Sequence, residues 1–307
     1  MRIKLCGLIA CAAMLAAGVV SCQQHDDIPQ GVKYPILFDS PDTRATATID
    51  DLKNNGFMVY AFVDGNAGST SFAKKVTHSV VDGRDIWALE TPEYWLPDTD
   101  YYFKAFYPSV PSAGTLAVDN DDENQDFTIE GYDITKQEDI MVASATASVD
   151  AGASAPASGS VVPLKFEHLL ANVVVKVKSE IPNVTVSNVS FEGVAQSGKY
   201  KKNIWTAGQT VSFGKQYTGD PLVKDAENYV DVTSGGILVI PENINGSQKM
   251  YITTSHKVYD FILQPITWES GMLYTYTLTI KQENIIFNEP TVEIWDEENA
   301  TGSVIIK

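Results

Sequence analysis

Val32–Arg44, VKYPILFDSPDTR, combines the pattern of a β-strand with that of an exposed cleavage site. Pro35 has no backbone N–H to donate to a ladder, which predicts that this strand lies at the edge of a sheet. Turn-forming residues 40–43 lead to Arg44, the residue type that a trypsin-like protease recognises. The stretch indicates either a first strand that cleavage can remove, as a device for polymerisation, or an ordinary first strand and loop. The side chains that alternate along one face of the strand, with the period of two of a half-buried strand, are Val32, Tyr34, Ile36 and Phe38.

The chain from Ala45 onward has the composition of a mainly β protein. Val, Ile, Thr, Tyr and Phe recur in short runs that Gly, Asn, Asp and Pro interrupt, and helical periodicity is scarce. Phe57–Val63 is a continuous apolar run that ends at Asp64-Gly65, which is typical of a buried strand that meets a turn. The sequence therefore predicts short antiparallel strands packed as β-sandwiches.

Length and a change in composition predict two domains. A chain of 307 residues suits two domains of ordinary size. Residues 145–160 are rich in Ala, Ser and Gly and contain one large apolar side chain, Val149, which is typical of a linker or a long surface loop. We therefore expect an N-terminal β-sandwich domain over residues 45–160 and a C-terminal one over residues 161–307.

The first residues predict a lipoprotein signal peptide, residues 1–21. Two basic residues precede an apolar run that is short for a membrane helix, and the run ends in Ser21-Cys22, which resembles the cleavage box of bacterial lipoproteins. Cys22 is then the acceptor of the diacylglycerol, and residues 22–44 form a lipidated tether followed by the removable strand. Because the other cysteines leave with the signal peptide, we expect no disulfide. The segment that follows, Gln24-His25-Asp26-Asp27, resembles an acid-rich signal for export to the outer face of the outer membrane, although a solvated linker has the same composition.

The C-terminal segment contains two further strand-forming runs, Thr291–Trp295 and Ser303–Lys307, separated by a polar turn. A terminal strand pair can leave its own domain and join the sheet edge of another molecule, or it can complete its own sandwich. The residues of this candidate donor strand are Val292, Ile294, Val304 and Ile306.

Charge and residue spacing disfavour several classes of function. The formal net charge of −17 repels nucleic acid. No nucleophile and base stand in a catalytic pattern, and Ser255-His256 is a pair of neighbours whose side chains diverge along a strand. We therefore expect no catalytic residue, no enzyme activity and no cofactor.

Metal binding is also disfavoured by the sequence. The histidines, His25, His78, His168 and His256, are scattered, and His168 is interpreted as a hydrogen-bonded structural residue at the domain junction. Asp119–Glu130 has oxygen ligands at several positions of a calcium loop, but Asn124 stands where such a loop requires glycine, and no helices flank it. We interpret this segment as a solvated acidic loop.

Several stretches, in this order along the mature chain, resemble the bacterial fimbrillins, the pilins of type V pili. They are the box at Cys22, Thr43-Arg44-Ala45, Phe103–Pro108, Gln137–Ala143, Phe166–Asn172 and Ile294-Trp295. The resemblance implies two tandem transthyretin-like antiparallel β-sandwich domains and a precursor exported as an outer membrane lipoprotein. It further implies that an arginine-specific protease cuts between Arg44 and Ala45, and that a donor strand from a neighbouring pilin subunit fills the groove left by the first strand.

These observations favour a structural pilus subunit of adhesive fimbriae on the cell surface, with other pilin subunits and the processing protease as its partners. The alternative is a surface lipoprotein that does not polymerise and binds glycans through exposed tryptophans. A secreted hydrolase is disfavoured because no paired acid and base can be located. The tryptophans available for the alternative are Trp87, Trp95, Trp205, Trp268 and Trp295.

Overall fold

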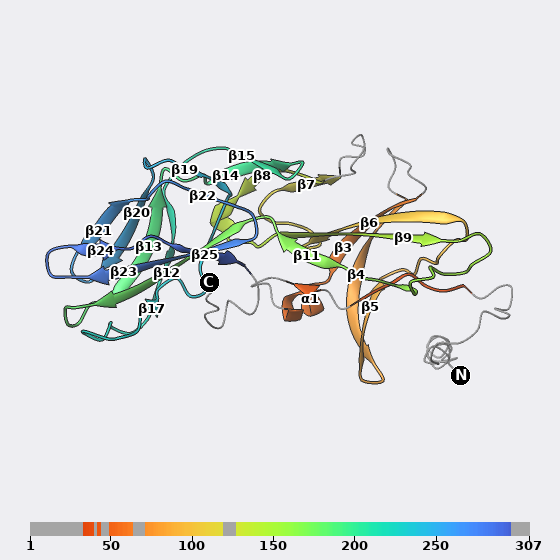
Figure 1. The fold of residues 1–307 in the computed structure, drawn as a ribbon, viewed down its shortest axis with the longest axis horizontal. Coiled ribbons are helices and arrows are strands. Elements are labelled where there is room, and N and C mark those ends of the chain that lie inside the picture. Colours follow the sequence, from red (N-terminus) through yellow and green to blue (C-terminus); the bar gives the residue numbers. More distant parts are fainter. Residues whose placement is uncertain (1–32, 40–41, 44–48, 64–70, 119–126, 296–307) are drawn as a thin grey trace, which may run out of the picture. The chain divides into compact units, whose positions relative to one another are not determined.

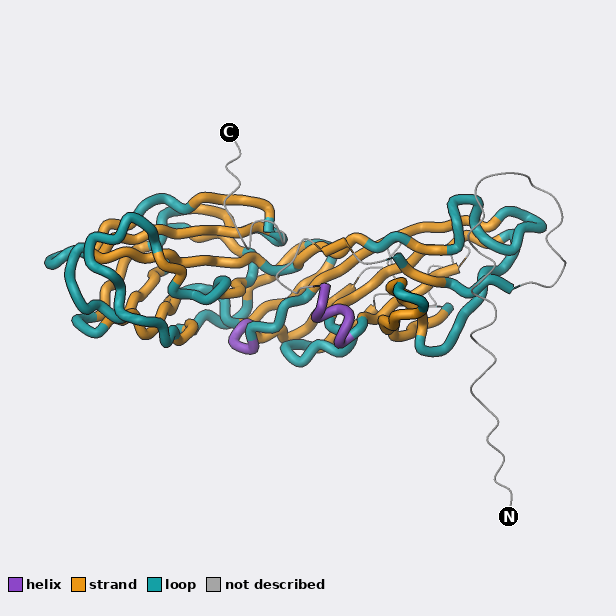
Figure 2. The backbone as a smooth tube through the Cα atoms, turned by 90° about the horizontal axis from the view of Figure 1, so that it is seen from below, coloured by secondary structure: helices purple, strands orange, loops and turns teal. Residues whose placement is uncertain are grey.

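The structure, a computed structural model, describes residues 33–39, 42–43, 49–63, 71–118 and 127–295. The described residues from Tyr34 to Trp295 belong to one compact unit. Strands dominate the described residues, which contain one short α-helix, α1 (Ile49–Asn55), and one 3-10 turn, η2 (Ile134–Lys136) (Figure 1, Figure 2). The prediction of a mainly β fold is confirmed. Within these ranges no helix has the length and the apolar character needed to span a membrane.

A nine-stranded sheet, in the order β10-β1-β5-β4-β3-β6-β9-β11-β2, encloses the first hydrophobic cluster. One end of the sheet is formed by β10 and β1, and the other end by β11 and β2. β1 and β2 are close in sequence, as are β10 and β11, so the same two chain segments form both ends. The sheet therefore folds back on itself around its core. The strands are β1 (Leu37–Phe38), β2 (Asp42–Thr43), β3 (Phe57–Val63), β4 (Phe72–Val81), β5 (Arg84–Leu89), β6 (Thr99–Tyr107), β9 (Met141–Val149), β10 (Val161–Val162) and β11 (Lys165–His168).

The predicted linker at residues 145–160 is wrong in its first part. Strand β9 continues to Val149 and pairs with β6 along its whole length. Ala145 and Ala147 are partly buried against the first cluster. Small side chains here pack on a sheet face, and a run of them carries no apolar signal strong enough to distinguish a strand from a loop.

The second hydrophobic cluster lies between a six-stranded and a four-stranded sheet. In the larger sheet β12 pairs with β23 in parallel, and the buried side chains of Val173, Val175 and Val177 contribute to the cluster. The larger sheet contains β12 (Ala171–Ser179), β17 (Val230–Asp231), β18 (Ile237–Val239), β23 (Met272–Ile280), β24 (Ile285–Phe287) and β25 (Thr291–Ile294). The smaller sheet contains β13 (Val186–Glu192), β16 (Phe213–Gln216), β20 (Lys249–Thr254) and β21 (Val258–Ile262).

Another four-stranded sheet, in the order β15-β14-β8-β7, joins strands from both sides of residue 160. Phe127 and Ile129 of β8 lie in the second cluster, together with residues that follow position 169. Hydrogen bonds and packing therefore cross the predicted boundary, and the division at residue 160 stays a prediction. The strands are β7 (Thr115–Val118), β8 (Phe127–Asp133), β14 (Ser197–Lys201) and β15 (Ile204–Ala207), and the remaining pair is β19 (Glu242–Ile244) with β22 (Ile266–Trp268).

The predicted edge position of the first strand is wrong. β1 pairs antiparallel with β5 on one side and parallel with β10 on the other. Pro35 forms an isolated antiparallel bridge with Tyr94. The hydrogen bonds beside this bridge use the neighbouring residues, since the Ile36 N–H donates to Glu93 O at 2.8 Å and the Trp95 N–H donates to the carbonyl of residue 34 at 3.1 Å. Proline is tolerated because its missing N–H falls where the ladder needs no donor.

Candidate functional site

The first strand packs against the core of the nine-stranded sheet, and we call the surface that it covers the seat of β1. The side chains of Ile36 and Phe38 are 1% and 3% exposed, whereas Leu37 between them is only partly buried. Tyr34 is a partly buried residue packed against the same cluster. The predicted alternation therefore holds for these residues, and Val32 lies outside the described ranges.

Phe38 is the central contact of this seat. Its ring meets Phe57 and Phe103 edge to face, with centroids 6.3 Å and 5.8 Å away. This geometry is favourable for aromatic pairs. Burial of two apolar side chains at roughly 1.5–3 kcal/mol each contributes roughly 3–6 kcal/mol to holding the strand.

Short backbone ladders complete the seat. β1 forms only two residue pairs with each neighbour, Leu37 with Ala88 and Val161, and Phe38 with Trp87 and Val162. The Asp39 N–H then donates to Val162 O at 2.9 Å. By comparison, the parallel pairing of β12 with β23 spans eight residue pairs. The first strand is thus tightly packed through its side chains but held by few backbone hydrogen bonds.

The predicted cleavage site, Arg44 and Ala45, lies outside the described residues, as does Cys22. The elements on either side are described. β2 pairs in parallel with β11, and α1 begins at Ile49. The other arginine after the predicted signal peptide is Arg84, an exposed residue at the start of β5. It pairs with Val81 across a tight two-residue turn, so its backbone is part of a β-hairpin.

The described part of the candidate donor segment lies in its own sheet. β25 pairs antiparallel with β23. Val292 and Ile294 are 45% and 44% exposed. Val304 and Ile306 lie outside the described residues, so the choice between a donor strand and a strand that completes its own sandwich stays open.

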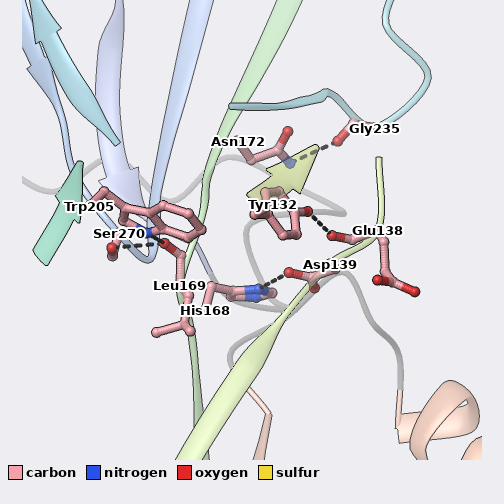
Figure 3. A network of polar contacts seen from close by, with 9 residues as sticks. All are labelled: Tyr132, Glu138, Asp139, His168, Leu169, Asn172, Trp205, Gly235 and Ser270. Atoms are coloured by element: carbon pink, nitrogen blue, oxygen red, sulfur yellow. Dashed lines mark hydrogen bonds and ion pairs between the residues drawn. The ribbon is translucent and has the colours of Figure 1, made fainter. Parts of the chain in front are cut away.

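Trp295 directly follows β25 and is buried beside a network of polar contacts. Its ring stacks on the imidazole of His168 with centroids 3.6 Å apart and an interplanar angle of 9°. His168 Nδ1 lies 2.9 Å from Asp139 Oδ1 (Figure 3). Nearby, the Tyr132 hydroxyl donates to Glu138 O, and burial, with neighbouring carboxylates, raises the pKa of Tyr132. The predicted hydrogen bond of His168 is confirmed, whereas its position at a domain junction stays a prediction.

The tryptophan platform of the alternative hypothesis is wrong. Trp87, Trp95, Trp268 and Trp295 are buried core residues. Trp205 is partly buried, and its Nε1 donates to Leu169 O at 2.7 Å. None of the five tryptophans is exposed, so they form no platform on which a sugar could stack.

Within the described ranges, no group of three or more His, Cys, Asp or Glu residues is placed to hold a metal ion. Of the acidic loop, residues 119–126 lie outside these ranges. Glu130, at its end, forms an ion pair with Lys199.

Comparison with known proteins finds a matching family and several similar structures. The model of the fimbrillin-like family matches residues 43–295. A fimbrial protein from Bacteroides vulgatus has a similar structure, with 17% identity, a TM-score of 0.59, and coverage of 84% of this chain and 99% of that chain. A candidate cell adhesion protein from Bacteroides uniformis gives 15% identity, a TM-score of 0.56, and coverage of 87% and 100%. These identities show the fold alone. No curated protein matches the chain.

Proposed function

The chain belongs to the fimbrillin-like family, whose members are fimbrial structural and adhesion proteins of the cell surface rather than enzymes, and we propose that it is a pilus subunit assembled by donor-strand exchange. In this proposal the precursor is exported as a lipoprotein with its lipid on Cys22. An arginine-specific protease then cuts after Arg44, the segment up to Arg44 leaves, and a strand from another pilin subunit takes its place.

The seat of β1 is the observation that carries the proposal. Roughly 3–6 kcal/mol of apolar burial is comparable with the total stability of a domain, about 5–15 kcal/mol. While the chain is intact, the first strand folds as part of the same molecule. After a cut at Arg44 it is held only by its side chains and its short ladders. A competing strand of similar pattern can then displace it.

Loss of the strand exposes a surface that favours strand addition. The contacts of Phe38 with Phe57 and Phe103 are lost, and the facing edges of β5 and β10 become free. An apolar groove between open ladder edges accepts an extended segment through backbone hydrogen bonds and alternate side-chain pockets. A donor with apolar residues at every second position fits. The C-terminal segment supplies this pattern at Val292 and Ile294 and again at Val304 and Ile306.

Site-specific digestion tests the cleavage step. Lipid-free protein that starts after Cys22 would be treated with an arginine-specific protease and its products identified by N-terminal sequencing. We expect one cut, with a new chain that begins at Ala45, because the backbone of Arg84 is paired within a hairpin. Arg44→Lys should abolish this cut, and the matched variant Arg84→Lys should leave it unchanged. Cleavage that persists in Arg44→Lys, or that is lost in Arg84→Lys, would contradict the proposal.

A further inference from the structure

Three exposed apolar side chains flank the first strand on the outer face of the sheet. Tyr94, Leu96 and Val161 are 41%, 55% and 45% exposed. They come from the segment that follows β5 and from β10, which are far apart in the sequence. We call these three residues the rim of the seat of β1. The assembly mechanism proposed above makes no use of them.

The pairing of the first strand places the rim on both of its sides. Tyr94 forms an antiparallel bridge with Pro35. Val161 is the parallel partner of Leu37. Residues that stand opposite each other on neighbouring strands project to the same face of a sheet. Because the residues of the first strand that alternate with Pro35 and Leu37 pack against the core, Tyr94 and Val161 face outward.

Contacts within the protein hold the rim in place. Trp95 is 4% exposed, and its Nε1 donates to Ser160 O at 3.2 Å. Ser160 directly precedes Val161, so this hydrogen bond links the two segments that carry the rim. The Leu96 N–H donates to the hydroxyl of Tyr101 at 3.0 Å. A surface that is fixed before a partner arrives lowers the entropic cost of binding it.

Loss of the first strand leaves this face with fewer charges. Lys33 and Asp39 are exposed and stand at outward positions of the strand, and both belong to the segment that is released by the cut at Arg44. The outward residues of the neighbouring strand β5, Ile86 and Ala88, are apolar and partly buried. A chain with a formal net charge of −17 repels copies of itself, so contact between copies is favoured where charges are few.

A donor strand brings the body of its own subunit to the seat, because the strand is part of the same chain. That body then lies next to the rim, which flanks the groove on both sides. Exposed apolar side chains beside a binding groove are typical of a protein interface. We propose that the rim docks on a second copy of this chain, the copy that donates its strand. This inference rests on the proposed function and extends the interface from the groove to the outer face of the sheet.

Charged substitutions on the rim test the inference in cleaved, lipid-free protein. The rim variants are Leu96→Glu and Val161→Glu, and Leu96→Lys separates the lost apolar contact from the added negative charge. The matched controls are Ile262→Glu and Val258→Glu on β21, where the parent residues are 52% and 55% exposed. Binding of a fluorescent peptide of residues 32–39 measures the seat, and size-exclusion chromatography measures polymer formation. Thermal melts of the uncleaved variants establish that each folds.

We expect the rim variants to bind the peptide within about twofold of the parent but to form polymer about tenfold more slowly, and the controls to match the parent in both respects. Rim variants that bind the peptide and polymerise normally would overturn the inference and leave the proposed function intact. A loss of polymer that is confined to the glutamate variants, or that is equal in the controls, would show general charge repulsion and overturn it too.

Peptide binding separates the rim from the seat. If the rim variants lose peptide binding, the rim acts only through the seat, and the inference fails. A parent protein that binds no peptide and forms no polymer would refute the proposed function, and the inference with it. If Val161→Glu does not fold, the two Leu96 variants decide the question, because Leu96 lies outside the strands.

Discussion

Phe38 contributes more ring contacts to the seat than any other residue of the first strand. Its removal leaves a cavity between Phe57 and Phe103. Phe38→Ala should lower the free energy of unfolding of the uncleaved protein by about 3–5 kcal/mol in urea denaturation. Leu37→Ala, on the partly exposed face of the same strand, is the matched control and should cost much less. Equal losses would show that the strand has no buried face in solution.

Glu242 provides a pH-dependent prediction. Burial raises the pKa of Glu242 more than its hydrogen bond from the Ala195 N–H lowers it. The folded state therefore holds this proton more tightly than the unfolded state. The resulting stabilisation is full below the unfolded pKa and is lost as pH rises through the folded pKa.

Glu242→Gln removes the charge and retains an acceptor for the Ala195 N–H. Thermal melts should show the variant to be more stable than the parent at about pH 8 and similar to it at about pH 4. Glu283→Gln, at an exposed position, should change little at either pH. A variant that is less stable than the parent at high pH would contradict the raised pKa of Glu242.

At the scale of the element, the first strand should be replaceable by a peptide with its own pattern. A synthetic peptide of residues 32–39, added to protein cleaved at Arg44, should occupy the groove beside β5 and block polymerisation. The same peptide with Asp in place of Ile36 and Phe38 should have no effect, because charged side chains cannot enter the seat. The fraction of polymer on size-exclusion chromatography measures both outcomes. Inhibition by both peptides would argue against strand replacement.

Elements with strong local patterns could be predicted from the sequence, and those that depend on distant partners could not. Phe57–Val63 is a buried strand, β3, as its continuous apolar run indicates. Pro35 suggested an edge, but only the register of the bridge to Tyr94 shows that no donor is needed there. The helix α1 has one buried residue, Leu52, and its seven residues are too few to display a helical period.

The site was predictable in part for the same reason. The alternation of Ile36 and Phe38 is a local signal, and both side chains are buried. The rim joins segments far apart in sequence, and no spacing along the chain marks Tyr94 and Val161 as the two flanks of β1. The tryptophans carry no local signal of burial, because the same residue type serves cores and sugar platforms.

At the scale of the whole molecule, we propose that the donor strand comes from the C-terminal segment. Deletion of residues 297–307 removes Val304 and Ile306 and keeps Trp295 with its stack on His168. The deleted protein should be cut at Arg44 as before and should remain monomeric in light scattering. If the protein that lacks residues 297–307 forms polymers of normal length, the donor strand lies elsewhere in the chain.

Light scattering coupled to size exclusion, before and after cleavage at Arg44, tests the central claim most directly, with mass spectrometry of the fragment that ends at Arg44. We predict that the uncleaved protein is a monomer. After the cut the fragment should leave the body, and high-mass species should appear as it is lost. A cleaved protein that keeps the fragment and stays monomeric at high concentration, with or without other pilin subunits, would contradict the account.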